Sequence, residues 1–204
     1  FVRGLAEAGA RVTGIGERPK EALGDDLQRW LFHYEQVGNV TSPDQVEPIL
    51  RFVQSKVHVD RLEATIEAHV MCAAVLRERC GIAGTSVHTT HLCRDKPTMK
   101  EVLRQAGIPT AASLGSSDVA EIRDFAGRVG FPLIVKPRDG AGAAGTHRVD
   151  DLPGLDRALA ESGVAQGRSV AIEEFVEGHE GFFDTLTLDG QVAHEFITHY
   201  YPGV

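Results

Sequence analysis

The stretch FPLIVKPRDGAGAAGTHRV, residues 131–149, decides the fold of this chain. It begins with a short apolar run that ends in lysine and proline, a pattern typical of a buried strand. A loop rich in glycine and alanine follows, with Gly140, Gly142 and Gly145 as its glycines. Glycines leave backbone N–H groups uncovered, and Lys136 beside them supplies a positive charge. The stretch therefore predicts a site for anionic oxygens such as those of a phosphate.

Two alternatives accompany this interpretation. The GxxxxGKS pattern of a P-loop is absent, so the loop is not predicted to be one. Lys136 also fits a lysine that reaches solvent from a strand end. A second lysine, Lys96, opens a predicted helix, where a cation opposes the helix dipole. Either an anionic ligand compensates that charge or an exposed lysine tolerates its position.

Around this stretch, residues 93–204 predict helices that alternate with antiparallel strands. One helix is expected to begin at Asp95 or Thr98 and to end at Gly107, and a second to begin near Ser117 and to end near Gly130. Further expected elements are strands at 146–149 and 168–176, a helix at 151–163 and a hairpin whose turn is Asp189-Gly190. This pattern predicts an α+β domain at residues 93–204.

Residues 1–92 alternate differently, with helices between strands. A helix that Gly9 stops leads into the strand-like ARVTGIG at 10–16, and a further helix is expected from Pro43. A short strand around Val57 to Val59 and a helix from about Leu62 to Cys80, stopped by Gly81, complete the pattern. The alternation predicts a parallel, doubly wound sheet. Residues 1–92 are thus interpreted as an α/β, Rossmann-like domain that lacks its first strand, and the chain is expected to be truncated at both ends.

The composition and net charge of the chain disfavour some classes of binding partner. The 204 residues are 42% hydrophobic and 25% charged, as in ordinary globular proteins, and their net charge of −8 disfavours nucleic acid and anionic membranes as main partners. The three cysteines have no CxxC spacing, which favours reduced thiols. The sequence shows neither a run of about 18 apolar residues nor a signal segment before residue 20, so a cytoplasmic protein is expected. His88, His91 and Cys93 lie close in sequence, but no second set of metal donors matches them, so no metal site is predicted there.

Three glutamates in the last third of the chain are candidates for ligand binding. Glu173 and Glu174 follow the apolar residues VAI in a predicted strand, so their side chains face opposite sides of the sheet. One of them therefore needs a partner, and a carboxylate accepts hydrogen bonds from an amino group such as that of adenine. Glu180, past the turn at Gly178, has two oxygens that suit both hydroxyls of a ribose, although a solvated turn residue explains it as well.

Taken in order, the segments RDKPTMKEVLRQAGIPT, FPLIVKPRDGAGAAGTHRV and VAIEEFVEGHEGFFDTLTLDGQV resemble the ATP-grasp superfamily. The resemblance covers residues 94 to about 204, and residues 1–92 resemble the Rossmann-like domain that precedes this fold in biotin carboxylase and the carboxylate-amine ligases. It implies the ATP-binding part of an ATP-dependent ligase that acts through an acyl phosphate, with ATP and a small carboxylate as partners. This part is expected to be inactive alone.

The resemblance also implies individual roles. Lys96 and Lys136 match the lysines that contact ATP phosphates, and residues 139–146 match the glycine-rich flap over them. Glu173 matches the carboxylate near the adenine amino group, while Glu174 and Val176 offer main-chain atoms to the base. Glu180 matches the ribose carboxylate. The Mg²⁺ ligands are expected downstream of this chain, so neither a metal ligand nor a catalytic residue is assigned.

Two other functions stay open at this point. ARVTGIGER resembles the second strand of an NAD-binding Rossmann fold, with Glu17 near the place of its ribose-binding acid. A relative of the ATP-grasp ligases that binds nucleotide without catalysis is the other alternative. The sequence leaves the carboxylate, the nucleophile and the oligomeric state, including a homo-oligomer, undetermined.

Overall fold

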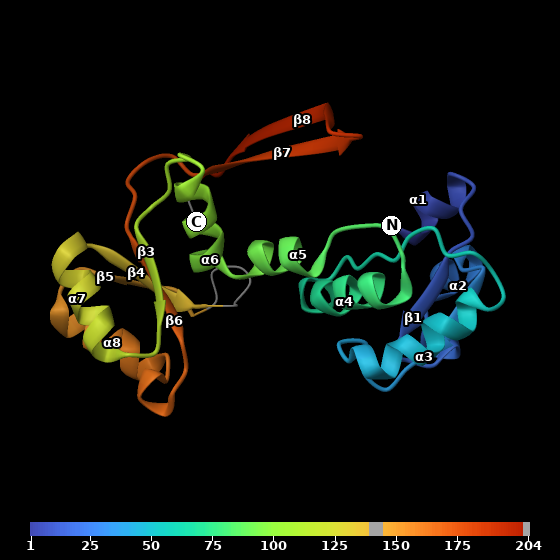
Figure 1. Ribbon diagram of the computed structural model, residues 1–204, viewed down its shortest axis with the longest axis horizontal. Coiled ribbons are helices and arrows are strands. Elements are labelled where there is room, and N and C mark those ends of the chain that lie inside the picture. Colours follow the sequence, from blue (N-terminus) through green and yellow to red (C-terminus); the bar gives the residue numbers. More distant parts are fainter. Residues whose placement is uncertain (139–144, 202–204) are drawn as a thin grey trace. The chain divides into compact units, whose positions relative to one another are not determined.

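The computed structural model describes residues 1–138 and 145–201 (Figure 1). The chain divides into two compact units, Phe1–Arg94 and Asp95–Val204. None of the described helices is long and apolar enough to cross a membrane.

The first unit is built of short helices and two parallel strands. Its elements are α1 (Val2–Glu7), β1 (Thr13–Gly16), the 3₁₀-helix η1 (Lys20–Ala22), α2 (Asp25–Trp30), β2 (His33–Gln36), α3 (Pro43–Gln54), the 3₁₀-helix η2 (Glu67–His69), α4 (Val70–Cys80) and α5 (Val87–Arg94). Strand β1 runs parallel to β2, with Thr13 opposite His33. Because α2 lies between them in sequence, the two strands form one crossover unit of the kind that helix and strand alternation predicts.

The core of this unit lies between α3 and α4. Val46 and Leu50 of α3 and Leu76 of α4 are buried there at helical spacing. The predicted helix from Pro43 is confirmed, as is the stop at Gly81, whose φ of 67° is the left-handed conformation that glycine adopts without strain.

Two expectations for this unit are wrong. Residues 57–59 form no strand, and the helix expected from Leu62 begins only at Val70, after η2. Val59 and Leu62 nevertheless pack against the core of the unit. Their apolar spacing is thus satisfied by an extended segment, while Ile66 stays 57% exposed. An apolar period alone does not distinguish these two outcomes.

The second unit contains a four-stranded antiparallel sheet in the order β3-β6-β4-β5. Its elements are α6 (Lys96–Gln105), β3 (Ser113–Ser116), α7 (Val119–Val129), β4 (Leu133–Pro137), β5 (His147–Val149), α8 (Leu152–Glu161), the 3₁₀-helix η3 (Val164–Gln166), β6 (Val170–Glu174), β7 (Gly181–Leu188) and β8 (Gln191–His199). The helices and strands predicted at 95–176 are all present, and β3 was not predicted.

One face of the sheet carries the core. Leu133 and Val135 of β4 and Ile172 of β6 are fully buried against Ile122 of α7 and Leu155 of α8. The two helices lie together on one side of the sheet, and α6 lies on the other (Figure 1). The alternation of strand side chains therefore sends the even-numbered residues of β4 and the odd-numbered residues of β6 toward α6.

The face toward α6 is lined in two rows across the strands. Register places Ser113, Glu173, Ile134 and Arg148 in one row, and Gly115, Ala171 and Lys136 in the next. A Cβ on Gly115 would lie 3.0 Å from the Pro97 side chain of α6. Glycine at this position therefore lets α6 pack closely on the sheet.

Strands β7 and β8 form the predicted hairpin. Asp189 and Gly190 at its turn have φ angles of 49° and 77°, the two positive values of a type I′ turn. Asp189 is the one non-glycine residue with positive φ in the described part of the chain.

Candidate functional site

The sheet face toward α6 holds a cluster of two lysines and one glutamate, which we call the Glu173 cluster: Lys100, Lys136 and Glu173. The ammonium of Lys136 donates to Glu173 Oε2 over 2.6 Å, and the ammonium of Lys100 lies 2.9 Å from the same oxygen. The Glu173 side chain is only 8% exposed, and those of Lys100 and Lys136 are 14% and 21% exposed. Two cations therefore share one buried carboxylate oxygen.

The charge of Glu173 is maintained by this arrangement. Burial raises the pKa of Glu173, but hydrogen bonds and charges from Lys136 and Lys100 outweigh burial and hold the pKa below its ordinary value. Its other oxygen, Oε1, is buried and accepts no hydrogen bond from any described residue. The opposite residue on β3, Ser113, likewise has a buried hydroxyl without a described partner. A buried acceptor of this kind is uncommon in proteins and indicates a place for a ligand or a water donor.

A second ion pair fixes the start of α6 beside the cluster. Asp95 caps the helix by accepting from the backbone N–H of Thr98 at 2.9 Å, which confirms the predicted N-cap. It also binds Arg138, with 2.6 Å between Arg138 Nε and Asp95 Oδ2. Because Arg138 directly follows β4, this pair ties the end of the strand to the helix start that carries Lys96.

The Asp95 carboxylate is strongly stabilised as an anion. Burial alone raises the pKa of Asp95, yet hydrogen bonds from Arg138 and Thr98 outweigh it and lower the pKa to about 2. Asp95 is therefore charged at neutral pH and holds Arg138 in an ion pair.

Of the predicted flap, residues 139–146, the structure describes only residues 145 and 146. Gly140 and Gly142 lie outside the described residues. Gly145 has a φ of 71°, and a Cβ there would lie 3.0 Å from the Pro137 side chain. Glycine is thus required at this position both by conformation and by the approach of β4.

Glu174 and Val176 lie where strand β6 ends. As strand alternation requires, Glu174 is exposed on the opposite face from Glu173, and its carboxylate accepts from the backbone N–H of Ala112 at 3.1 Å. Its own N–H donates to Ala112 O at 2.9 Å, so this main-chain donor is already used. Val176 is 66% exposed.

Phe175, next to Val176, makes a cation–π contact with Arg148. The guanidinium of Arg148 lies 4.3 Å from the ring centroid of Phe175, and Arg148 belongs to the same cross-strand row as Glu173.

Glu180 does not belong to the four-stranded sheet. It is exposed just before β7, and its main-chain carbonyl accepts from the N–H of Tyr200 at 3.0 Å, which closes the base of the hairpin. The predicted ribose role of Glu180 stays a prediction.

Lys100 is the residue that sequence reasoning missed. Lys96 and Lys100 are four residues apart on α6 and so lie on the same side of the helix. This spacing was the available signal: a lysine predicted to contact a ligand implies a second candidate one turn later.

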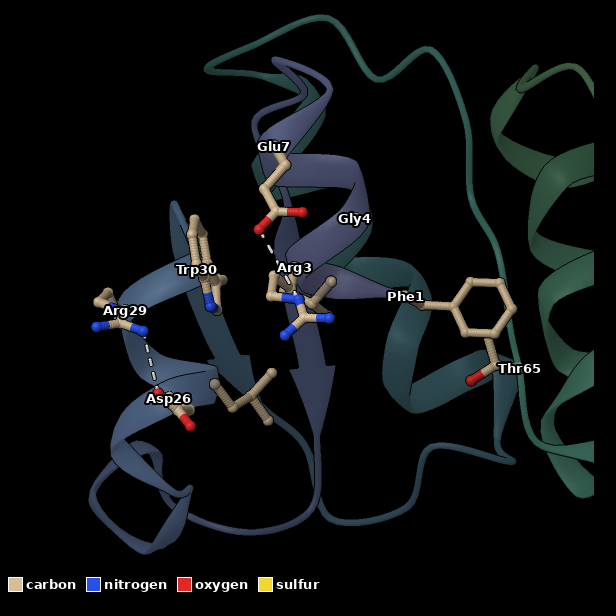
Figure 2. Close-up of a pocket in the computed structure, with 10 residues that line it drawn as sticks. Phe1, Arg3, Gly4, Glu7, Asp26, Arg29, Trp30 and Thr65 are labelled. Atoms are coloured by element: carbon tan, nitrogen blue, oxygen red, sulfur yellow. Dashed lines mark hydrogen bonds and ion pairs between the residues drawn. The ribbon is translucent and has the colours of Figure 1, made fainter.

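The first unit has a pocket of its own, with a volume of about 680 Å³. Figure 2 shows Phe1, Trp30 and Thr65 around it, with ion pairs between Arg29 and Asp26 and between Arg3 and Glu7.

Glu17, the residue that suggested NAD, does not line this pocket. Its carboxylate instead accepts from the N–H of Val40 at 3.1 Å. The geometry of the first unit therefore lends no support to a ribose contact by Glu17.

Metal donors do not gather in the described residues. Nowhere in residues 1–138 and 145–201 do three or more histidine, cysteine, aspartate or glutamate side chains converge as a metal site.

Comparison with protein families matches residues 95–182 to the ATP-binding domain of the carbamoyl-phosphate synthase L chain. The L-arginine-specific L-amino acid ligase of Bacillus subtilis is 30% identical over 84% of this chain, which covers 43% of that protein. D-alanine–D-alanine ligase A of Mesorhizobium japonicum is 28% identical over 70% of this chain and is covered to 38%. The chain thus spans about four tenths of the length of these relatives.

Solved structures agree on the fold. The L-amino acid ligase of Bacillus licheniformis superposes with a TM-score of 0.77 at 20% identity, over 98% of this chain and 47% of that one. The biotin carboxylase domain of the Hydrogenobacter thermophilus 2-oxoglutarate carboxylase, solved with MgADP and bicarbonate, has a TM-score of 0.66 at 23% identity, over 89% of this chain and 42% of that one. The family match identifies residues 95–182 as an ATP-binding domain of the ATP-grasp superfamily, and the solved structures show that the chain has the fold of ATP-grasp ligases.

Proposed function

We propose that this chain is the ATP-binding part of an ATP-dependent carboxylate ligase. The observation that carries the proposal is the Glu173 cluster, which gathers two ammonium groups and a buried unpartnered acceptor on one sheet face within the matched residues. In the reaction, a carboxylate oxygen attacks the γ-phosphorus of ATP, the bond to the bridging oxygen breaks, and ADP leaves. The resulting acyl phosphate is attacked at its acyl carbon by a nucleophile, which displaces phosphate.

The chain's own residues bind and orient the nucleotide in this proposal. Phosphoryl transfer asks the protein chiefly for positioning and neutralisation of charge. Lys136 and Lys96 neutralise the phosphates, and the flap with Gly140, Gly142 and Gly145 donates N–H groups to them.

The base and the sugar are held by the remaining predicted residues. Glu173 Oε1 accepts from the adenine amino group, and Glu180 binds the ribose hydroxyls. Of the main-chain groups, the carbonyl of Glu174 and the backbone of Val176 face the base edge, because the N–H of Glu174 already donates to Ala112.

Mg²⁺ is the cofactor proposed with ATP, and none of the described residues is assigned to it. We also interpret residues 1–92 as the Rossmann-like domain preceding the ATP-grasp domain, which the parallel β1-β2 pair supports. A cytoplasmic location and a small carboxylate substrate remain part of the proposal.

Titration and trapping test this function. Calorimetry of the protein with ATP and Mg²⁺ is expected to show binding, and NAD is expected to give no heat. Incubation of the whole ligase, of which this chain is the proposed ATP-binding part, with ATP, Mg²⁺, hydroxylamine and a pool of amino acids is then expected to yield hydroxamates together with ADP, because hydroxylamine captures an acyl phosphate. ATP binding without hydroxamate would favour the non-catalytic binder, and binding of NAD but not ATP would refute the proposal.

A further inference from the structure

Glu173 contacts two lysines, which together carry more positive charge than is needed to neutralise one carboxylate. Both lysines contact the same oxygen, Oε2, while all three side chains are largely removed from solvent. A single ammonium suffices to compensate one carboxylate, so the second cation needs another reason. The two lysines also come from different elements, Lys136 from the strand that leads into the flap and Lys100 from α6.

The proposed function gives the two lysines different roles, because only Lys136 is expected to bind ATP. Lys136 is expected to bind ATP phosphates, yet its ammonium lies 2.6 Å from Glu173 in the structure. Moving it onto a phosphate removes one cation from a buried carboxylate. If no other cation were present, the carboxylate would stay charged without a partner or would take up a proton, and both outcomes oppose binding.

We propose that Lys100 is a positioning residue that stays on Glu173 as its counter-ion and thereby lets Lys136 leave the carboxylate for the phosphates of ATP. This inference rests on the proposed function. Among the described residues, the charged groups that face Glu173 are Lys136 from β4 and Lys100 from α6, and β3 contributes only the Ser113 hydroxyl opposite it. The neighbouring cation Arg138 is bound to Asp95 and does not replace Lys100.

Proton uptake is the readout that separates this role from a merely structural one. In Lys100→Met, Glu173 keeps Lys136 before ATP binds and has no described counter-ion afterwards, so its pKa rises on binding. A group whose pKa rises takes up protons, and ATP affinity of this variant then improves as pH falls. In the wild type Lys100 holds the pKa low in both states, and Glu173 takes up none.

Calorimetry with ATP and Mg²⁺ at pH values from about 5 to about 8, in buffers of different ionisation enthalpy, measures this uptake. At about pH 8 Lys100→Met is expected to bind ATP about tenfold more weakly, the equivalent of a one-unit rise in the pKa of Glu173 on binding. At about pH 5 it is expected to take up about half a proton more per ATP than the wild type. Lys100→Arg keeps the charge and is expected to restore both values. Urea unfolding of each variant verifies that it folds.

A double-mutant cycle covers the case in which Lys100→Met perturbs the fold. Glu173→Gln carries no charge, so adding Lys100→Met to it is expected to change ATP affinity by no more than about twofold. An equal loss in both backgrounds would mean that Lys100 binds phosphate itself, and would overturn the proposal.

The outcomes distinguish the two proposals. A wild type that binds no ATP overturns both. A wild type that binds ATP, with Lys136→Met defective and Lys100→Met normal in affinity and proton uptake, overturns the role of Lys100 and leaves the ATP-binding function intact.

Discussion

Replacement of Lys136 by methionine is expected to weaken ATP binding by roughly 100-fold, because a hydrogen bond between charged groups contributes up to about 3 kcal/mol. Methionine keeps the unbranched apolar stem beneath α6 and removes only the ammonium. Glu173 retains Lys100 in the variant, so the fold is expected to survive. Isothermal titration with ATP and Mg²⁺ measures the loss.

Lys56→Met is the matched control for this experiment. Lys56 lies in the first unit, where its ammonium is 5.5 Å from the ring centroid of Phe52. The same substitution there is expected to leave ATP affinity unchanged. Equal affinities in the wild type and in both variants would remove Lys136 from the site.

Replacement of Asp95 by alanine is expected to lower the free energy of unfolding by about 3 kcal/mol. Loss of the helix cap accounts for ~1 kcal/mol. Loss of the negative charge accounts for about 2 kcal/mol, which corresponds to the lowering of the Asp95 pKa to about 2 by the hydrogen bonds from Arg138 and Thr98 together. Urea unfolding at neutral pH measures the sum.

Asp95→Asn separates the two terms, since asparagine still caps the helix but carries no charge. It is expected to lose only the contribution of the negative charge, most of which is the ion pair with Arg138. Because the folded-state pKa of Asp95 is depressed, the pair stabilises the protein above about pH 4, and this contribution is lost as pH falls toward 2. The difference between the wild type and Asp95→Asn should therefore shrink over that interval, and a difference independent of pH would show that the ion pair contributes nothing.

The sequence predicted the second unit well because its signals are local. The N-cap at Asp95, the apolar run before Lys136 and the Asp189-Gly190 turn each act within a few residues. Strand β3 escaped prediction because it is four residues long and contains Gly115, which is weak strand material in isolation. Its pairing with β6 is a tertiary effect.

The candidate site was predicted in part. Lys136 and Glu173 do meet, although they are 37 residues apart, since β4 and β6 are neighbours in the sheet. Lys100 was missed because its spacing from Lys96 places it on the same side of the helix but does not show that its side chain is buried. The ammonium of Lys100 reaches Glu173 only because α6 packs over β6, which is a tertiary contact.

In the first unit, the apolar residues Val59 and Leu62 suggested a strand and a helix that do not form. Both side chains pack on the core from an extended segment instead. Their periodicity reflects burial, and burial does not by itself specify the backbone conformation.

A crystal structure of the protein with a non-hydrolysable ATP analogue and Mg²⁺ tests the central claim most directly. The account predicts that the analogue lies on the sheet face toward α6, with the Lys136 ammonium on its phosphates and Lys100 still on Glu173. An analogue bound elsewhere, for instance in the pocket beside Trp30, with Lys136 still on Glu173, would contradict the account.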